Sequence, residues 1–225
     1  MMEKARRQAG RGSKGFTLIE LLIVVAIIAI LALIAVPNFL EAQVRSKISR
    51  AYADMRVIGV ALEAYAVDRN SYPPGFTNLR QGIRPDLHPK ERNPYAMSKL
   101  TTPVAYLTSM LIDPFSGAGS TWDREFDWNT GPLPYWYEDW QPHPVFGGWV
   151  YPGAETIWKY GYTWTVASMG PVCNAGRLRF ALEGRPVGQA PAGVDYFAYD
   201  PTNGTVSRGI IARTNKGHFK EVNQK

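Results

Sequence analysis

The sequence contains few of the residues from which many active sites are built. Cys173 is the only cysteine among 225 residues, so no disulfide can form within the chain. The three histidines, His88, His143 and His218, have no spacing typical of a metal-binding pair. The sequence has no G-x-S-x-G motif and no P-loop. These absences argue against the common hydrolases, nucleotide-binding enzymes and zinc enzymes.

Paired carboxylates are the remaining route to an enzyme, because two acids can act together as general acid and base. The candidates are Asp123, Asp127, Glu138 and Asp139. We expect these side chains to be solvated charges on loops. The sequence therefore predicts that the protein is not an enzyme and has no catalytic residue.

The segment from Phe16 to Val36 lacks lysine, arginine, glycine and proline, and Thr17 and Glu20 are its only polar residues. As a helix it would be about 31 Å long, which matches a hydrocarbon core of about 30 Å. We predict a single transmembrane helix over residues 16–36. A carboxylate near the bilayer centre costs roughly 3 kcal/mol on insertion scales, so Glu20 is a candidate functional residue.

Residues 1–15 form a basic leader that carries most of the formal net charge of +6. The leader contains one acid, Glu3, and five cations: Lys4, Arg6, Arg7, Arg11 and Lys14. Because cationic flanks stay in the cytoplasm, we expect a cytoplasmic N-terminus and a C-terminal part exported to the periplasm. The rest of the chain has only a small positive excess, so no nucleic-acid partner is expected.

A second helical pattern follows Pro37. Apolar residues recur at alternating spacings of four and three: Val44, Ile48, Ala51, Met55, Ile58, Leu62 and Tyr65. This pattern predicts an amphipathic helix over residues 37–69 that packs on the protein's own globular domain. The sequence DRNSYPPG, residues 68–75, ends it, because two prolines and a glycine cannot continue a helix. We predict one long helix over residues 16–69, with Pro37 as a site of bending.

Residues 70–225 are expected to form the periplasmic globular domain. Residues 96–110 are a short helical candidate, and YGYTWTVAS, residues 160–168, alternates as a strand does. Residues 195–211 are typical of a hairpin with an Asn-Gly turn. The predicted fold class is α+β, with a long N-terminal helix packed on a small antiparallel β-sheet domain.

Gly15 followed by FTLIELLIVVAIIAILALIAVPNF resembles the start of type IV pilin-like proteins, which include pilins and the pseudopilins of type II secretion systems. The matching residues are Gly15, Phe16, Glu20 and Pro37. The resemblance implies that a prepilin peptidase cuts between Gly15 and Phe16 and N-methylates Phe16. It also implies that the processed subunit leaves the inner membrane and joins a helical filament.

The charge chemistry of the processed N-terminus agrees with this resemblance. Cleavage leaves a positive amine on Phe16, and a lone charge among apolar helices is costly unless an opposite charge pairs with it. Glu20 of one subunit can pair with the Phe16 amine of a neighbour and set the axial register. The glutamate can also compensate its own N-terminus at the positive end of the helix dipole.

The resemblance is strongest to a major pseudopilin of a type II secretion system; a type IV pilus subunit remains the alternative. It implies these partners: other copies in a homo-oligomeric filament, prepilin peptidase, other pseudopilins, an inner-membrane secretion or pilus assembly platform, and membrane lipid before assembly. Major pseudopilins often order a C-terminal loop with calcium, near a motif that SMGPV, residues 168–172, resembles. Val172 replaces the acid of that motif, while Asn174, Asp195, Asp200 and Asn203 offer oxygen atoms. We assign no metal site and no cofactor.

An aromatic-rich insertion over residues 122–164 leaves a second function open. It holds all seven tryptophans. Packing or subunit contact would explain these rings, and so would a polysaccharide-binding surface on an adhesive minor pilin. Exposure of Trp122, Trp128, Trp136, Trp140 and Trp149 on one surface would favour the binding surface.

Overall fold

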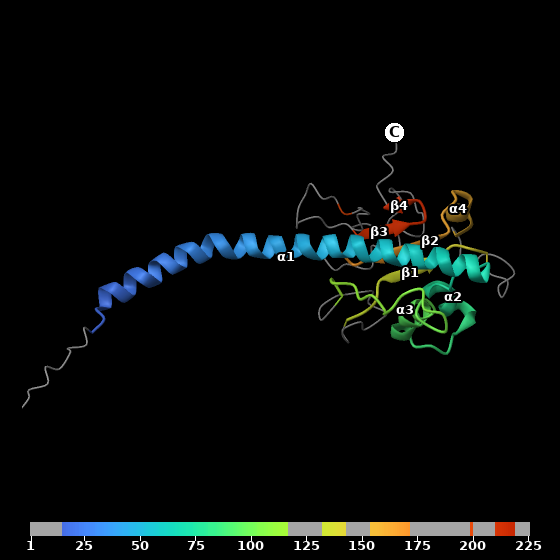
Figure 1. Cartoon of the computed structure of the whole chain (residues 1–225), viewed down its shortest axis with the longest axis horizontal. Coiled ribbons are helices and arrows are strands. Elements are labelled where there is room, and N and C mark those ends of the chain that lie inside the picture. Colours follow the sequence, from blue (N-terminus) through green and yellow to red (C-terminus); the bar gives the residue numbers. More distant parts are fainter. Residues whose placement is uncertain (1–14, 117–131, 143–153, 172–198, 200–209, 219–225) are drawn as a thin grey trace, which may run out of the picture. The chain divides into compact units, whose positions relative to one another are not determined.

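The computed structural model describes residues 15–116, 132–142, 154–171, 199 and 210–218 (Figure 1). The helices are α1 (Leu18–Arg69), α2 (Phe76–Asn78), the π-helical turn η1 (Leu79–Ile83), α3 (Pro89–Ser98) and α4 (Ala154–Lys159). The strands are β1 (Trp136–Asp139), β2 (Trp164–Ser168), β3 (Ile211–Thr214) and β4 (Gly217–His218). The chain divides into two compact units, residues 1–42 and 43–225.

The first unit consists of the apolar part of α1. Every described side chain from Gly15 to Leu40 is exposed, and an 18-residue window has a mean hydropathy of 3.2. By length and composition α1 is able to cross a membrane. The helix is unbroken from Leu18 to Arg69 and includes Pro37, which confirms the predicted long helix within two residues of its start. Bending at Pro37 stays a prediction.

In the second unit, α1 packs against the globular core through the predicted apolar face. Ile48, Ala51, Met55, Ile58 and Leu62 are buried. Val44 and Tyr65, at the ends of the same face, are partly buried and pack on the same cluster. The amphipathic pattern is therefore confirmed residue by residue.

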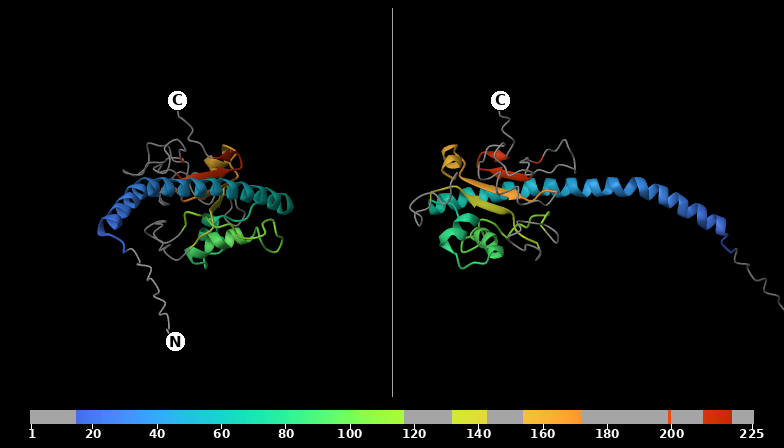
Figure 2. Two further views of the ribbon diagram at one scale, coloured as in Figure 1. Left: turned by 60° about the vertical axis from the view of Figure 1, so that its left-hand side comes forward. Right: turned by 180° about the vertical axis from the view of Figure 1, so that it is seen from behind.

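The sheet is antiparallel with the order β1-β2-β3-β4. Tyr137 pairs with Val166, and Val166 pairs with Arg213 on the next strand. The strands lie behind α1 in Figure 1 and in front of it after a turn of 180° (Figure 2, right), so the sheet covers one side of the helix. This helix-on-sheet arrangement confirms the predicted α+β class.

The helix predicted over residues 96–110 is wrong. The observed helix α3 starts at Pro89, whose fixed φ suits the first helical position, and the Glu91 carboxylate accepts a bond from the His88 N–H at 3.0 Å. It ends at Ser98, whose carbonyl accepts the N–H groups of Thr101 and Thr102, both at 3.0 Å. These bonds close the helix at Ser98, twelve residues before the end of the predicted helix.

The strand predicted over residues 160–168 is confirmed in its second half. β2 begins at Trp164, because Gly161 adopts a positive φ of 76° and its N–H bonds back to Trp158 at 2.7 Å. Most of the predicted hairpin at residues 195–211, including its Asn-Gly turn, lies outside the described residues. The observed hairpin joins β3 to β4 through Asn215 and Lys216.

Candidate processing and assembly site

The predicted cleavage junction lies immediately before α1. Gly15, Phe16 and Thr17 precede the first helical residue, and all three are exposed, Phe16 by 74%. A Cβ atom added to Gly15 would meet nothing within 4 Å. Packing in this structure therefore does not explain a glycine at position 15. The predicted leader, residues 1–14, lies outside the described residues.

Thr17 and Glu20 form a reciprocal cap on the first turn of α1. The Glu20 carboxylate accepts bonds from the Thr17 N–H at 2.9 Å and from the Thr17 hydroxyl at 2.7 Å. In return, the Glu20 N–H donates to Thr17 Oγ1 at 3.3 Å. This is a capping box, in which a threonine at the N-cap and a glutamate three residues later satisfy each other's donors.

The cap fixes where the carboxylate of Glu20 lies. Both bonds that Thr17 donates reach the same oxygen, Oε2, so the side chain is folded back toward the helix start. Thr17 is the residue directly after Phe16, whose nitrogen would become the new amine. The structure thus places an acid at the end of the helix where cleavage would create a positive charge. Our interpretation of the sequence identified Glu20 but missed Thr17, although the T-x-x-E spacing is readable.

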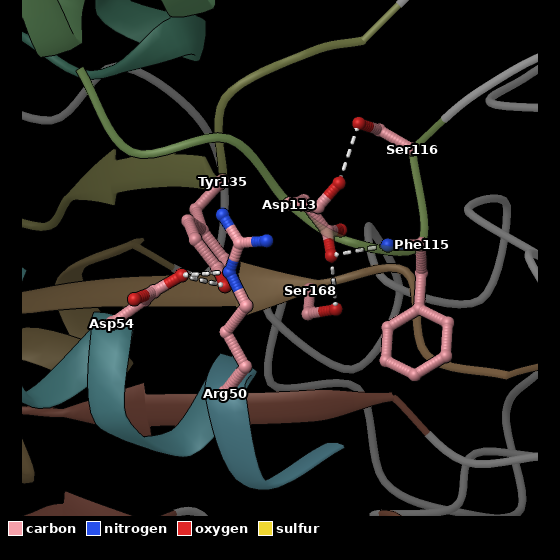
Figure 3. A network of polar contacts seen from close by, with 7 residues as sticks. All are labelled: Arg50, Asp54, Asp113, Phe115, Ser116, Tyr135 and Ser168. Carbon is pink, nitrogen blue, oxygen red and sulfur yellow. Dashed lines mark hydrogen bonds and ion pairs between the residues drawn. The ribbon is translucent and has the colours of Figure 1, made fainter. Parts of the chain in front are cut away.

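A second polar cluster lies inside the globular unit, around Asp113 (Figure 3). Asp113 is 1% exposed, and its carboxylate accepts the Phe115 N–H at 3.0 Å, the Ser168 hydroxyl at 2.7 Å and the Met169 N–H at 2.9 Å. Burial raises the pKa of the Asp113 carboxyl. These bonds tie the turn after residue 112 to the end of β2.

A neighbouring chain of contacts joins α1 to the start of β1. Arg50 and Asp54 form an ion pair at 3.5 Å, and Asp54 accepts the Tyr135 hydroxyl at 2.9 Å (Figure 3). Burial and the nearby Asp54 carboxylate raise the pKa of Tyr135. Asp113 and Tyr135 both bond groups of the fold itself, so we assign both clusters a structural role.

The expectation that Glu138 and Asp139 are solvated loop charges is wrong. Both lie on β1 and are only 4% and 6% exposed. Hydrogen-bond donors in the segment that follows α1 bond both carboxylates. Thr77 donates its N–H to Glu138 at 3.0 Å and its hydroxyl at 2.7 Å. The Gly75 N–H and the Asn78 amide reach Asp139 at 2.5 and 2.6 Å. Burial raises the pKa of Glu138 to about 8 and that of Asp139 to about 7.

The described residues do not assemble a metal site. Among them, no three His, Cys, Asp or Glu side chains come together in a way that could hold a metal ion. Ser168, the first residue of the SMGPV segment, uses its hydroxyl to bond Asp113. The oxygen-bearing residues considered for calcium lie outside the described residues: Asn174, Asp195, Asp200 and Asn203. The same is true of Asp123, Asp127 and His143.

The described tryptophans of the aromatic-rich region are mainly packing residues. Trp140 and Trp164 are 1% and 2% exposed. Each donates its indole N–H within the fold, Trp140 to Thr165 at 2.8 Å and Trp164 to Glu63 at 2.7 Å. Trp136 is partly buried and stacks at a tilt on Phe76, with ring centroids 4.2 Å apart. Trp122, Trp128 and Trp149 lie outside the described residues.

Comparison with known proteins finds a family model and several relatives that match this chain. The model of a family described as "Prokaryotic N-terminal methylation motif" matches residues 10–36. The type II secretion system core protein G of Pseudomonas aeruginosa is 32% identical over 105 residues, which cover 47% of this chain and 70% of that protein. The core protein G of Pectobacterium carotovorum is 32% identical over 87 residues, or 38% and 56% of the two chains.

Pilins match a shorter segment at higher identity. The type IV major pilin protein PilA of Myxococcus xanthus is 48% identical over 60 residues, which cover 27% of each chain. The matches thus span from about a quarter to 70% of these relatives' lengths. No solved structure matches significantly. Because the chain covers 70% of one core protein G and carries the methylation motif at its start, it belongs to the type II secretion system core protein G family of pilin-like proteins.

Proposed function

We propose that this protein is a structural, non-enzymatic subunit of a pilus-like filament, a pseudopilin of a type II secretion system. One observation carries the proposal: a capped, membrane-length apolar helix begins two residues after an exposed Gly15–Phe16 junction. Prepilin peptidase cuts this junction and methylates Phe16. Residues 16–36 anchor the precursor in the inner membrane and then enter the filament core.

The charge distribution supports an orientation for the precursor. The leader, residues 1–15, keeps the N-terminus in the cytoplasm, and the globular unit lies in the periplasm. Glu20 then pairs with the Phe16 amine of a neighbouring copy as that copy's leader is lost. The partners of this route are the peptidase, the inner-membrane assembly platform, other pseudopilins and further copies of this chain.

The first test is the N-terminus of the protein isolated from its native host. Mass spectrometry should find a chain that starts at methylated Phe16. Replacing Gly15 by a bulky residue, as in Gly15→Val, should abolish cleavage without affecting the fold, because this position contacts nothing. A wild-type chain that still starts at Met1 would contradict the proposal.

The second test concerns Glu20. Glu20→Ala should leave membrane insertion and cleavage intact but reduce incorporation into sheared filaments by at least about tenfold, since the buried amine loses its acid. A matched control is Glu155→Ala, which removes an exposed carboxylate paired with Lys159 on α4. Equal incorporation of the Glu20→Ala and wild-type chains would remove the role assigned to Glu20.

A type IV pilus subunit is the second candidate, favoured by the higher identity to a pilin, 48% over 60 residues. The alignment to core protein G extends farther, over 105 residues, and so includes part of the globular unit. We therefore rank the pseudopilin first. Neighbouring genes for an outer-membrane secretion channel would support it, and a gene for a retraction motor would support the pilus.

A further inference from the structure

Residues 73–78 follow α1 and lie along the outer edge of strand β1; we call them the clasp segment. Among the described strands, β1 is the first in the order β1-β2-β3-β4, so it forms one edge of the sheet. The Tyr137 hydroxyl donates to the Pro73 carbonyl at 2.8 Å. A Cβ atom at Gly75 would lie 2.6 Å from the Asp139 nitrogen, so backbone rests on backbone at this point. The clasp segment thus packs directly against the edge strand.

Two neighbouring acids of β1 bond the clasp segment from both faces of the strand. Successive residues of a strand point to opposite faces, so Glu138 and Asp139 lie on opposite sides of β1. Glu138 accepts the N–H and the hydroxyl of Thr77. Asp139 accepts the Gly75 N–H and the Asn78 amide. Because both acids are buried, they hold the clasp segment around the edge of the strand in a site shielded from water.

The donors of these four bonds are two backbone N–H groups, a hydroxyl and an amide, and all of them are neutral. A hydroxyl can donate or accept, so Thr77 Oγ1 can bond Glu138 in either charge state. Burial raises the pKa of Glu138 to about 8 and that of Asp139 to about 7, so both carboxyls lose their protons near neutral pH. Ionisation thus places two adjacent negative charges in a buried site.

Other titratable or charged groups face this region from the elements packed around it. They are Tyr65 and Glu63 on α1, Tyr72 after α1, Tyr137 on β1 and Arg92 on α3, whose guanidinium lies 5.8 Å from the centroid of the Phe76 ring. Burial raises the pKa of Tyr72 and Tyr137, so both stay neutral. On β2, Thr165 and Trp164 pair with the two acids, and neither residue titrates. The two acids are thus the buried groups of this region whose charge changes between pH 6 and pH 8.5.

We propose that Glu138 and Asp139 form a proton-dependent clasp, which holds the clasp segment on β1 while both carboxyls are neutral and releases it when their protons pass to water. Release lets water solvate the two charges, which neutral donors in a buried site do less well. Asn93 on α3 accepts the Tyr137 N–H at 3.0 Å and keeps the preceding part of the same edge covered, so the opening is local. The clasp concerns the globular unit and does not depend on the proposed filament function.

Hydrogen exchange of the full-length protein in detergent tests the clasp. Labelling times at pH 6 and pH 8.5 are scaled to equal intrinsic exchange, and peptides that cover residues 72–78 and 51–62 are compared. Protection of residues 72–78 should fall at least about a hundredfold between the two pH values, because opening frees both acids to ionise. At pH 8.5 it should also be at least about tenfold lower than that of residues 51–62, on the buried face of α1. Unchanged protection would overturn the clasp, and so would equal protection of the two peptides at pH 8.5, which would mean that the whole globular unit opens.

A variant that cannot ionise gives a second readout. Glu138→Gln keeps an oxygen for the Thr77 N–H, and its amide can donate to the Thr77 hydroxyl. Its fall in protection between pH 6 and pH 8.5 should be at least about tenfold smaller than that of the wild type. Glu155→Gln, which changes an exposed carboxylate paired with Lys159, should behave like the wild type. A fall as large in Glu138→Gln as in the wild type would overturn the clasp, and the wild-type comparison decides it if Glu138→Gln does not fold.

Discussion

Two glycines show how differently one residue type can be constrained. A Cβ at Gly15 would meet nothing, whereas a Cβ at Gly75 would lie 2.6 Å from the Asp139 nitrogen and 2.8 Å from Glu138 Cα. Gly75 has an ordinary φ of −72°, so close approach to β1 is what requires a glycine there. The first glycine thus reflects processing in our proposal, and the second reflects packing.

Gly75→Ala should therefore destabilise the folded protein. The methyl group would collide with backbone atoms of β1, and such overpacking typically costs about 1–3 kcal/mol. Thermal unfolding of the full-length protein in detergent, followed by circular dichroism, should show a lower midpoint. Gly15→Ala is the matched control and should unfold like the wild type. An unchanged midpoint for Gly75→Ala would mean that the segment after α1 does not rest on β1 as described.

At the scale of elements, α1 was largely predictable, strand β2 was predicted in part and strand β1 was not predicted. Hydrophobic periodicity identifies the buried face of α1, because a helix repeats its pattern over many residues. β1 is four residues long and its last two residues are acids, so its sequence contains no apolar alternation to recognise. Its burial depends on donors from Gly75, Thr77 and Asn78, which lie about sixty residues earlier in the sequence.

In the candidate site, too, the residues that could be predicted belong to a local sequence motif. Gly15, Phe16 and Glu20 were predicted from a local motif, and the Thr17 cap could have been read from the same segment. The exposed apolar face of α1 that holds Val57, Val60 and Val67 was not predicted, because one amphipathic pattern already accounts for a helix that packs on its own domain. Only the exposure of Val57, Val60 and Val67 separates the two faces.

The two faces of α1 should respond differently to truncation. Met55 is fully buried, so Met55→Ala should cost about 2–5 kcal/mol of the free energy of unfolding. Val60 is 68% exposed, so Val60→Ala should change the free energy of unfolding by no more than about 0.5 kcal/mol. Chemical denaturation of the two variants in detergent would measure both values. Similar losses at the two positions would contradict the assignment of inner and outer faces.

On the scale of the whole molecule, the buried acids of β1 connect the segment after α1 to the sheet. Glu138 and Asp139 accept bonds from Gly75, Thr77 and Asn78. Tyr72 and Tyr137 are further titratable groups that bond this region, and Glu63 accepts the Tyr72 hydroxyl at 2.9 Å. Tyr72 donates its N–H to Gln141 at 3.1 Å, and the Tyr137 hydroxyl donates to Pro73 at 2.8 Å. The pKa values of both tyrosines are also raised, by burial, so they remain neutral.

These acids predict a pH dependence with a definite sign. The folded pKa values of Glu138 and Asp139 are about 8 and 7, above the ordinary values of 4.5 and 3.8. Their contribution to stability is therefore complete below about pH 4 and is lost as the pH rises through 7 to 8. Each unit of pKa difference is worth about 1.4 kcal/mol, and about five such units are lost between pH 5 and pH 9, so the unfolding midpoint should fall by at least about 10 °C over this range.

Neutral variants separate this effect from the titration of the rest of the protein. Glu138→Gln keeps an oxygen for the Thr77 N–H and removes the ionisable group, so its midpoint should fall less steeply between pH 5 and pH 8 than that of the wild type. Glu155→Gln alters an exposed carboxylate and should leave the slope unchanged. If Glu138→Gln and the wild type lose stability in parallel up to pH 9, Glu138 is ionised in the folded protein across this range. The segment after α1 would then be held to β1 by charged acids, and the predicted loss of stability at high pH would have to arise elsewhere in the molecule.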